Sequence, residues 1–420
     1  MFYAPQPRSR LYTTFSAYLR GLAALLDRGT PQDPRVSEFE RKLGEVFSGQ
    51  EVVAMPMARV GIYLLLKCLI QPGQKVILSP YTISDVVNMV LCAGGVPVFA
   101  DVEANGSCNI DANEVAKLLR AETNVGAVLV THMYGLTCDV DTVVALCKPL
   151  NVPVIEDAAQ AFGARVGNRM AGTIGTAGVF SFGLLKNVTA FVGGAIITAD
   201  RGLAQRVREE LAQFNGSAPK MIAKKMLSGL MFDVATLPVV FHAAVYWLFR
   251  WAYLNDVKFF NNKLDTDSNP VAYKTLPKAY RHRMTGTQAR LAQSQLGLVD
   301  KHIDERVGRA KLYDEGLRGL SGIQVPPFRA DHSHIYLYYP VLAKQRDAVG
   351  QSMTRQLRDV QISHHRNCAN LPCFSEFRRD CPNAERAANE VIYLPTYPTY
   401  TDDQVQANVR AIRRFLQEGI

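Results

Sequence analysis

The chain has 420 residues, of which 48% are apolar and 20% are charged. That length predicts two or three domains, and that composition excludes a mainly disordered, collagen-like or low-complexity chain. The net charge of +9 favours anionic partners, such as phosphorylated metabolites, nucleic acid or an anionic membrane surface, without choosing among them.

The cysteines and histidines predict neither a disulfide framework nor a metal centre. None of the eight cysteines forms a Cys-x-x-Cys pair and most lie in apolar runs, so we expect reduced thiols in a cytosolic protein. The N-terminal residues lack the apolar region of a signal peptide. His132 falls at a predicted strand end and could line a pocket, whereas we interpret His364 and His365 as ordinary loop residues.

Between about residues 51 and 200, short apolar runs alternate with stretches of helical periodicity. This alternation predicts a largely parallel sheet covered by helices, with ligands bound at the carboxyl ends of the strands. The predicted strands are 52–55, 75–79, 96–100, 126–131, 152–155, 177–182 and 195–198, and helices are predicted at 59–69, 85–92 and 140–150.

Residues 217–270 do not follow this alternation of strands and helices, and we predict that they form an apolar insertion. Its segment 226–249 carries a single charge, Asp233, and 255–269 reads as a polar loop. One predicted helical stripe is apolar: Leu237, Val240, Phe241, Ala244, Val245, Leu248, Phe249 and Ala252. A second stripe is more polar: His242, Tyr246, Arg250 and Tyr253.

Three interpretations of the insertion stay open. It is a buried core or dimer-interface element, or an amphipathic anchor over 226–254 that lies on a membrane surface, a role that the two tryptophans and basic flanks suit. A true membrane span is the weakest of the three, because the uncharged run 234–249 is short and contains Pro238.

The remainder of the chain predicts a basic segment and a smaller C-terminal domain. Residues 271–290 carry five basic and no acidic side chains. A long helix is predicted at 296–318, strands at 335–342 and 391–394, and a last helix at 402–417 capped by Thr401. The predicted organisation is an N-terminal arm with helices (1–50), a large domain (51–216), the insertion (217–270), a basic segment with an interdomain helix (271–318) and a small domain (319–420).

Three groups of residues at strand ends carry chemistry. Asp157 is either a helix cap or a buried carboxylate that pairs with a cation or a protonated ring nitrogen. Lys186 is either a surface lysine or a desolvated amine that forms a Schiff base with an aldehyde, and Ser181 before it could donate to a phosphate. The turn 55–59 offers backbone N–H groups to a phosphate at a helix N-terminus. Together they provide the three groups that pyridoxal phosphate requires: an amine for its aldehyde, a carboxylate for its ring nitrogen and a site for its phosphate.

Over most of its length outside 217–270, the sequence resembles the DegT/DnrJ-type sugar aminotransferases, which are pyridoxal-phosphate enzymes of fold type I. The resemblance rests on VIEDAAQAFGARVGNRMAGTIGTAGVFSFGLLKNVTAFVGGAIITAD, with support from PGQKVILSPYTISDVVNMVLCAGGVPVFADVE and YRHRMTGTQARLAQSQL. It implies a large cofactor-binding domain with a mostly parallel seven-stranded sheet covered by helices, and a smaller α+β domain.

The resemblance also implies residue roles. Lys186 matches the Schiff-base lysine that shuttles a proton, Asp157 matches the acid on the pyridine nitrogen, and Gln160 matches the residue facing the phenolic oxygen. Relatives that remove a sugar hydroxyl carry histidine in place of the lysine, so Lys186 favours transamination.

The phosphate cradle departs from the family pattern. Ser181 and the amides of Ala58 and Arg59 match it, but the turn reads Pro-Met-Ala where the family usually has Ser-Gly-Thr. Ile83 stands where an aromatic residue usually stacks on the ring. Arg281 stands where the family's asparagine reaches across a dimer interface, and it could replace the lost phosphate contacts with one charge-assisted bond.

The resemblance implies an aminotransferase that moves an amino group from an amino acid, which we take to be glutamate, to a keto group of a nucleotide-activated sugar. The product would serve a surface polysaccharide or glycoconjugate, and the basic segment 271–290 is either a site for the diphosphate or a solvated helix face. We expect a cytoplasmic homodimer with no nucleic-acid partner and a peripheral contact with the inner membrane face. The departures leave one alternative, a non-catalytic sensor or scaffold that binds the same cofactor.

Overall fold

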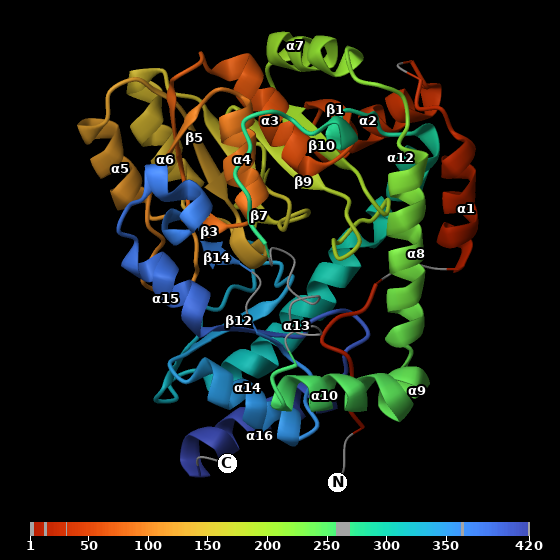
Figure 1. Cartoon of the computed structure of the whole chain (residues 1–420), viewed down its shortest axis with the longest axis vertical. Coiled ribbons are helices and arrows are strands. Elements are labelled where there is room, and N and C mark those ends of the chain that lie inside the picture. Colours follow the sequence, from red (N-terminus) through yellow and green to blue (C-terminus); the bar gives the residue numbers. More distant parts are fainter. Residues whose placement is uncertain (1–3, 12–14, 31, 258–268, 363–364, 419–420) are drawn as a thin grey trace.

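The computed structural model of the chain describes residues 4–11, 15–30, 32–257, 269–362 and 365–418. A large α/β domain and a smaller α+β domain are joined by the long helix α13 (Val299–Leu317), which runs diagonally between them (Figure 1). His364 and most of the predicted polar loop 255–269 lie outside the described residues. All eight cysteines lie within them, and none is in a disulfide.

A seven-stranded sheet forms the centre of the large domain, in the order β1-β10-β9-β6-β5-β2-β4. Four adjacent pairs are parallel, and β10 runs antiparallel to both of its neighbours. The strands are β1 (Glu51–Met55), β2 (Lys75–Leu78), β4 (Val96–Phe99), β5 (Val125–Thr131), β6 (Val154–Asp157), β9 (Ala177–Ser181) and β10 (Gly194–Thr198). The predicted fold class is therefore confirmed.

Helices cover both faces of this sheet, so the strands are buried on both sides. In β1, Val53 packs into the core cluster under α3, whereas its neighbour Val52 packs into the cluster under α2. The helices are α2 (Pro34–Val46), α3 (Ala58–Leu69), α4 (Ser84–Cys92), α5 (Ala112–Ala121), α6 (Val140–Cys147), α7 (Arg201–Ala212) and α12 (Gly286–Gln293). Several begin at a side-chain cap, as at Asp33, Asp111, Asp139, Asp200 and Thr285, which accept backbone N–H groups of the first turn.

Two predicted strands differ from the observed ones. The prediction 152–155 begins too early, because β6 covers Val154–Asp157 and makes Asp157 its last residue. Within the described range that follows, residues 158–164 form turns and no helix, so the interpretation of Asp157 as a helix cap is wrong. The prediction 335–342 is only partly right, since β12 covers Tyr339–Ala343 and the residues before it are irregular.

The small domain packs a four-stranded antiparallel sheet, in the order β11-β12-β15-β13, against helices. Its elements are β11 (Ile323–Gln324), β12, α14 (Arg346–Arg355), β13 (Gln361–Ile362), α15 (Pro382–Glu390), β15 (Val391–Leu394) and α16 (Asp402–Glu418). A further strand, β14 (Arg366–Asn367), leaves this domain and pairs with β3 (Tyr81–Thr82) of the large domain. This pairing ties the two domains together beside the carboxyl edge of the large sheet. The remaining strands form the hairpin of β7 (Arg165–Val166) and β8 (Arg169–Met170).

The predicted insertion folds as helices that touch both domains. α8 (Pro219–Ala235) stands beside α1 (Phe15–Leu26), and α9 (Pro238–Val240) and α10 (Tyr246–Leu254) turn across the end of the small domain (Figure 1). The Tyr246 hydroxyl donates a hydrogen bond to the Thr354 carbonyl oxygen at 2.6 Å, which fixes α10 to α14. No described helix is by itself long and apolar enough to span a membrane; α8 taken with α9 and α10 passes by length and composition, but the pair bends by 66°.

The two predicted stripes of the insertion do not separate into a buried face and an exposed face. A π-helical turn at Phe241–Val245 interrupts the regular helical repeat between α9 and α10. Beyond it, Tyr246 of the predicted polar stripe is buried, whereas Leu248 of the predicted apolar stripe is 45% exposed. Each π turn adds a residue to the repeat, so a pattern read at 3.6 residues per turn drifts around the helix.

Large apolar side chains of α1 and of the insertion are exposed, and we call them together the apolar surface. It comprises Leu19, Leu22 and Leu26 of α1, Leu227, Leu230, Met231 and Val234 of α8, and Leu237, Val239, Trp247, Leu248 and Trp251 around α9 and α10.

Candidate active site

The carboxyl ends of β6 and β9 place the predicted catalytic residues together. The two strands are parallel neighbours, with Asp157 opposite Val179 in register. Asp157 therefore ends β6 beside the loop that leaves β9 at Ser181 and contains Lys186. This is the edge at which open α/β sheets bind ligands.

Lys186 is a desolvated amine rather than an ordinary surface lysine. Burial is the main cause that lowers the pKa of its ammonium to about 8; the negative charge of Asp157 opposes the shift, and the positive charge of Arg59 adds to it. An amine with this pKa has an appreciable uncharged fraction near neutral pH, which is the form that attacks an aldehyde. Lys186 is half-buried, and its lowered pKa favours the desolvated amine over the surface lysine.

Asp157 is a buried carboxylate that faces this lysine. Burial raises its pKa, while the backbone N–H of Ala159 and the charge of Lys186 lower it. Its Oδ1 accepts that N–H at 3.0 Å, which fixes the side chain at the end of the strand. A carboxylate held here can pair with a protonated ring nitrogen more strongly than it could in water.

Glu156, the residue before Asp157, holds the surrounding loops in place. Its carboxylate accepts a hydrogen bond from His132 Nε2 at 2.9 Å and from the backbone N–H groups of Gly172, Ile174 and Gly175 at 2.8, 2.7 and 2.6 Å. Burial would raise the pKa of Glu156, but these donors hold it below its ordinary value. This role of Glu156 has no signal in the sequence, because two adjacent acids at a strand end do not reveal which one faces the loops.

The N-terminus of α3 and the end of β9 form an open cradle. Met57 provides no side-chain cap to α3, so the first backbone N–H groups of the helix keep no side-chain acceptor. Gly194 pairs with both Ser181 and Met55, and a Cβ at Gly194 would lie only 2.8 Å from the Ala58 nitrogen. Glycine at this position therefore lets Ser181 and the helix N-terminus approach one another, an arrangement that binds phosphate.

The guanidinium of Arg59 is engaged elsewhere. It forms an ion pair with Asp85 of α4 and donates to the Tyr280 hydroxyl at 3.1 Å. Arg59 therefore offers its backbone N–H, and the electrostatic field of its charge, to the cradle.

These observations fit pyridoxal phosphate. The desolvated amine of Lys186 suits its aldehyde, the buried carboxylate of Asp157 suits its pyridine nitrogen, and the uncapped helix N-terminus beside Ser181 suits its phosphate.

Comparison with known proteins agrees with this assignment. The sequence profile of the DegT/DnrJ/EryC1/StrS aminotransferase family matches residues 21–233 and 257–413. The chain belongs to this family. It is a pyridoxal-phosphate-dependent aminotransferase, so the alternative of a non-catalytic scaffold is not supported.

Individual relatives are distant but match along nearly the whole chain. The spore coat polysaccharide biosynthesis protein SpsC of Bacillus subtilis is 27% identical over 90% of this chain and 89% of its own length. GDP-perosamine synthase of Escherichia coli O157:H7 is 25% identical over 91% and 90%. Among solved structures, the aminotransferase TlmJ of Streptoalloteichus hindustanus aligns with a TM-score of 0.74, 24% identity and full coverage of both chains, which shows the shared fold.

The structure assigns Gln160 of this aminotransferase to a hydrogen-bonded network that crosses the domain interface. Its Oε1 accepts the backbone N–H of Tyr134 at 3.0 Å, and its Nε2 lies 3.3 Å from His365 Nε2. His365 Nδ1 lies 3.2 Å from the Tyr393 hydroxyl, which in turn lies 3.1 Å from that of Tyr81. Because the Gln160 amide group donates to Nε2, His365 carries its proton on Nδ1. The interpretation of His365 as an ordinary loop residue is wrong.

The remaining predicted site residues, Ile83 and Arg281, lie at the margins of the site. Ile83 is the N-cap residue of α4 and packs against the core next to the inter-domain strand β3. Arg281 follows a short helical turn, η4 (Lys278–Tyr280), and its side chain is exposed. In the described part of this single chain, no hydrogen bond or ion pair brings the Arg281 guanidinium to Ser181 or to the start of α3.

The lowered pKa of Lys186 gives a pH prediction. Below pH 8 the amine is mostly protonated and unreactive, and above it the amine is mostly free, so capture of the cofactor by the apoprotein should rise with a midpoint near pH 8. The visible absorbance that develops on mixing with pyridoxal phosphate from pH 6 to 10.5 measures this. Asp157→Asn should move the midpoint lower, because the carboxylate charge raises it, and Lys186→Ala should develop no band. A midpoint near 10 would contradict the desolvated-amine assignment.

Proposed function

We propose that the protein transfers an amino group from glutamate to a keto group of a nucleotide-activated sugar, in the biosynthesis of amino sugars for a surface polysaccharide or glycoconjugate. The observation that carries the proposal is the desolvated Lys186 facing the buried Asp157 in a chain of this family. Two relatives named for GDP-perosamine and spore coat polysaccharide support the substrate class and the purpose.

Each predicted residue has a role in this proposal. When bound, pyridoxal phosphate supplies an electron sink for the carbon that gains or loses the amino group. Lys186 holds it and then carries the proton to and from that carbon. Asp157 keeps the ring nitrogen protonated, and Gln160, positioned by Tyr134 and His365, faces the phenolic oxygen.

The phosphate is assigned to Ser181 and to the backbone N–H groups of Ala58 and Arg59, as the open helix N-terminus supports. Ile83 packs against the ring. The exposed Lys278 of the basic segment suits the diphosphate of the sugar nucleotide.

A two-step spectroscopic experiment tests the proposed function. The visible band of the lysine-bound cofactor should disappear on addition of glutamate, because the amino group passes to the cofactor. A nucleotide 4-keto sugar added next should restore the band, whereas the free sugar without nucleotide should not. If glutamate leaves the band unchanged, or if only simple keto acids restore it, the nucleotide-sugar assignment is overturned.

The exposed position of Arg281 supports a homodimer in which this residue completes the phosphate site of the partner subunit. Arg281→Ala should raise the dissociation constant for pyridoxal phosphate about tenfold, since a charge-assisted hydrogen bond is lost. Arg281→Asn, which restores the family's residue, should recover part of the affinity. Arg290→Ala is the matched control on the same segment and should have no effect. Equal cofactor affinity for the wild type and Arg281→Ala would refute this role.

We also propose that the protein is cytoplasmic and lies peripherally on the inner membrane face through its apolar surface. Exposed basic residues flank that surface: Arg20 of α1 and Lys220, Lys224 and Lys225 of α8. Two acidic residues nearby are engaged by neighbouring side chains: Asp233 of α8 accepts the Tyr18 hydroxyl at 2.5 Å, and Asp27, just after α1, pairs with Arg35. An apolar face with only positive charge around it suits an anionic bilayer, to which each basic residue adds about 1 kcal/mol.

Flotation with vesicles in which about one third of the lipid is anionic tests this contact. The intact protein should float at low salt and less in 0.5 M salt, because salt screens the electrostatic part. Trp247→Ser with Trp251→Ser should abolish flotation, since both side chains lie on the apolar surface, whereas Leu298→Ser, at an exposed leucine elsewhere, should not. If the protein does not float, or if the tryptophan variant instead becomes monomeric, the surface is a subunit interface and the membrane proposal fails.

A further inference from the structure

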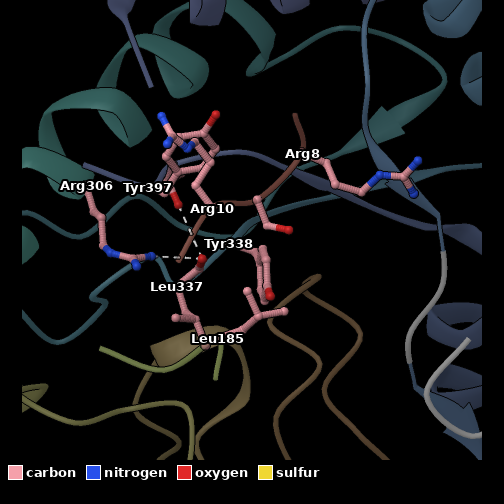
Figure 2. Close-up of a pocket in the computed structure, with 9 residues that line it drawn as sticks. Arg8, Arg10, Leu185, Arg306, Leu337, Tyr338 and Tyr397 are labelled. Atoms are coloured by element: carbon pink, nitrogen blue, oxygen red, sulfur yellow. Dashed lines mark hydrogen bonds between the residues drawn. The ribbon is translucent and has the colours of Figure 1, made fainter. Parts of the chain in front are cut away.

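One cavity borders the loop that contains Lys186, and it is too small for a substrate. Leu185 lines it together with Arg10 of the N-terminal arm and with Leu337 and Tyr338 of the small domain (Figure 2). Its volume is about 20 Å³, which leaves room for about one water molecule. The groups that bind the substrate must therefore lie along another part of this loop.

Helix α8 of the insertion packs against the same loop through Leu184. A Cβ at Gly229 would lie 3.0 Å from the Leu184 side chain. Gly229, Met226 and Ile222 are the buried residues of α8 and define its inward face. Lys225 precedes Gly229 by about one helical turn, so it lies at the margin of this face and on the side of the catalytic loop.

The position of Lys225 differs from that of the two other lysines of α8. At about 100° per residue, Lys220 and Lys224 fall opposite the inward face, whereas Lys225 borders it. In the part of the chain that the structure describes, no hydrogen bond or ion pair engages the Lys225 ammonium. The pKa of this ammonium is lowered by partial burial and by the positive charges of Arg59 and Lys224. Lys225 is therefore a cation that lies among other cations.

Arg59 connects this lysine with the catalytic lysine and with the basic segment. The charge of Arg59 lowers the pKa of Lys186 as well as that of Lys225, which places the three groups in one region. Its guanidinium donates to the Tyr280 hydroxyl at 3.1 Å, so η4 brings the exposed Lys278 toward the same region. Positive charge from α3, α8 and η4 thus gathers beside the cofactor loop and attracts an anion.

The chemistry of the substrate narrows the choice of anion. The cofactor's phosphate is assigned to Ser181 and to backbone N–H groups at the start of α3, which leaves the side-chain charges for a second anion. A diphosphate carries more negative charge than a carboxylate and can bind several separate cations, and lysine is a common phosphate ligand.

The distance along α8 suits the same anion. In a nucleotide keto sugar, the sugar ring separates the diphosphate from the carbon that must reach Lys186. The ligands of the diphosphate must therefore lie near this lysine without touching it. Lys225 is four residues, or about 6 Å along the helix, from the point at which Gly229 meets the catalytic loop.

We propose that Lys225 of the insertion, together with Lys278 of the basic segment, binds the diphosphate of the nucleotide sugar. This rests on the proposed function, because it takes a nucleotide sugar to be the amino acceptor. It gives the insertion a part in substrate binding and leaves Lys220 and Lys224 to the anionic lipid. A lipid headgroup offers the same phosphate chemistry to Lys225, so the experiment compares both sources.

Calorimetric titration of the holoenzyme with UDP and with GDP tests the site without turnover. Lys225→Gln should weaken binding of the nucleotide that the wild type prefers at least tenfold, because a charge-assisted hydrogen bond is lost. Lys225→Arg keeps the charge and should retain most of the affinity. Lys224→Gln is the matched control, since it removes the same charge from the outward face of α8, and it should bind the nucleotide as the wild type does. The visible band of the bound cofactor should be the same in all four proteins.

Kinetics and flotation give the second readout. Lys225→Gln should raise the KM for the nucleotide keto sugar at least tenfold, leave the glutamate half of the reaction unchanged and float with anionic vesicles as the wild type does. Unchanged nucleotide affinity of Lys225→Gln, an equal loss in Lys224→Gln, or no binding of either nucleotide by the wild type would overturn the proposal. Loss of flotation with unchanged nucleotide binding would assign Lys225 to the lipid headgroup instead.

The two proposals fail in different ways. If nucleotide binding depends on Lys225 but no nucleotide keto sugar restores the visible band, the proposed function fails by itself and the diphosphate site stands. If a nucleotide keto sugar restores the band equally well in Lys225→Gln and in the wild type, at the same KM, the role of Lys225 is refuted and the proposed function stands.

Discussion

The placement of one buried amine opposite one buried carboxylate is the constraint on which the rest of the site depends. Lys186 and Asp157 are both pushed by burial toward their uncharged forms, and each charge partly offsets that effect on the other. Such a pair is costly to hold unless its surroundings are rigid. The parallel pairing of β6 with β9 sets the distance, and the hydrogen bonds of Glu156 to residues 172–175 fix the loop that enters β9. The same burial that costs stability gives Lys186 a pKa useful at neutral pH.

The helices of the insertion contact the surroundings of that site and also carry much of the apolar surface. α8 packs against the catalytic loop so closely that a Cβ at Gly229 would lie 3.0 Å from the Leu184 side chain. α10 is fixed to the small domain through Tyr246, and the inter-domain strand pair β3–β14 leads to His365 and Gln160. The N-terminal arm lies between them and brings Arg10 to the cavity beside Leu185. Elements far apart in the sequence therefore surround the loop that contains Lys186.

The sequence was sufficient for the parts that depend on local pattern. Continuous apolar runs predicted the strands, and the residues just beyond them, Asp157 and Lys186, followed from where parallel strands end. The parts that failed depend on contacts between distant segments or on irregular backbone. No spacing signal connects His365 with Gln160, 205 residues away. A single π turn was enough to bury Tyr246 of the polar stripe and expose Leu248 of the apolar one, because the pattern carries no sign of the added residue.

The most direct test of the central claim is to find which lysine holds the cofactor. Reduction of the holoenzyme with borohydride makes that bond permanent, and peptide mapping by mass spectrometry then locates it. The account predicts a single modified lysine at Lys186, with no modification of Lys186→Ala. Modification at Lys220, Lys224 or Lys225 of α8 instead, or equal modification of several lysines, would contradict the assignment of the site to the carboxyl ends of β6 and β9.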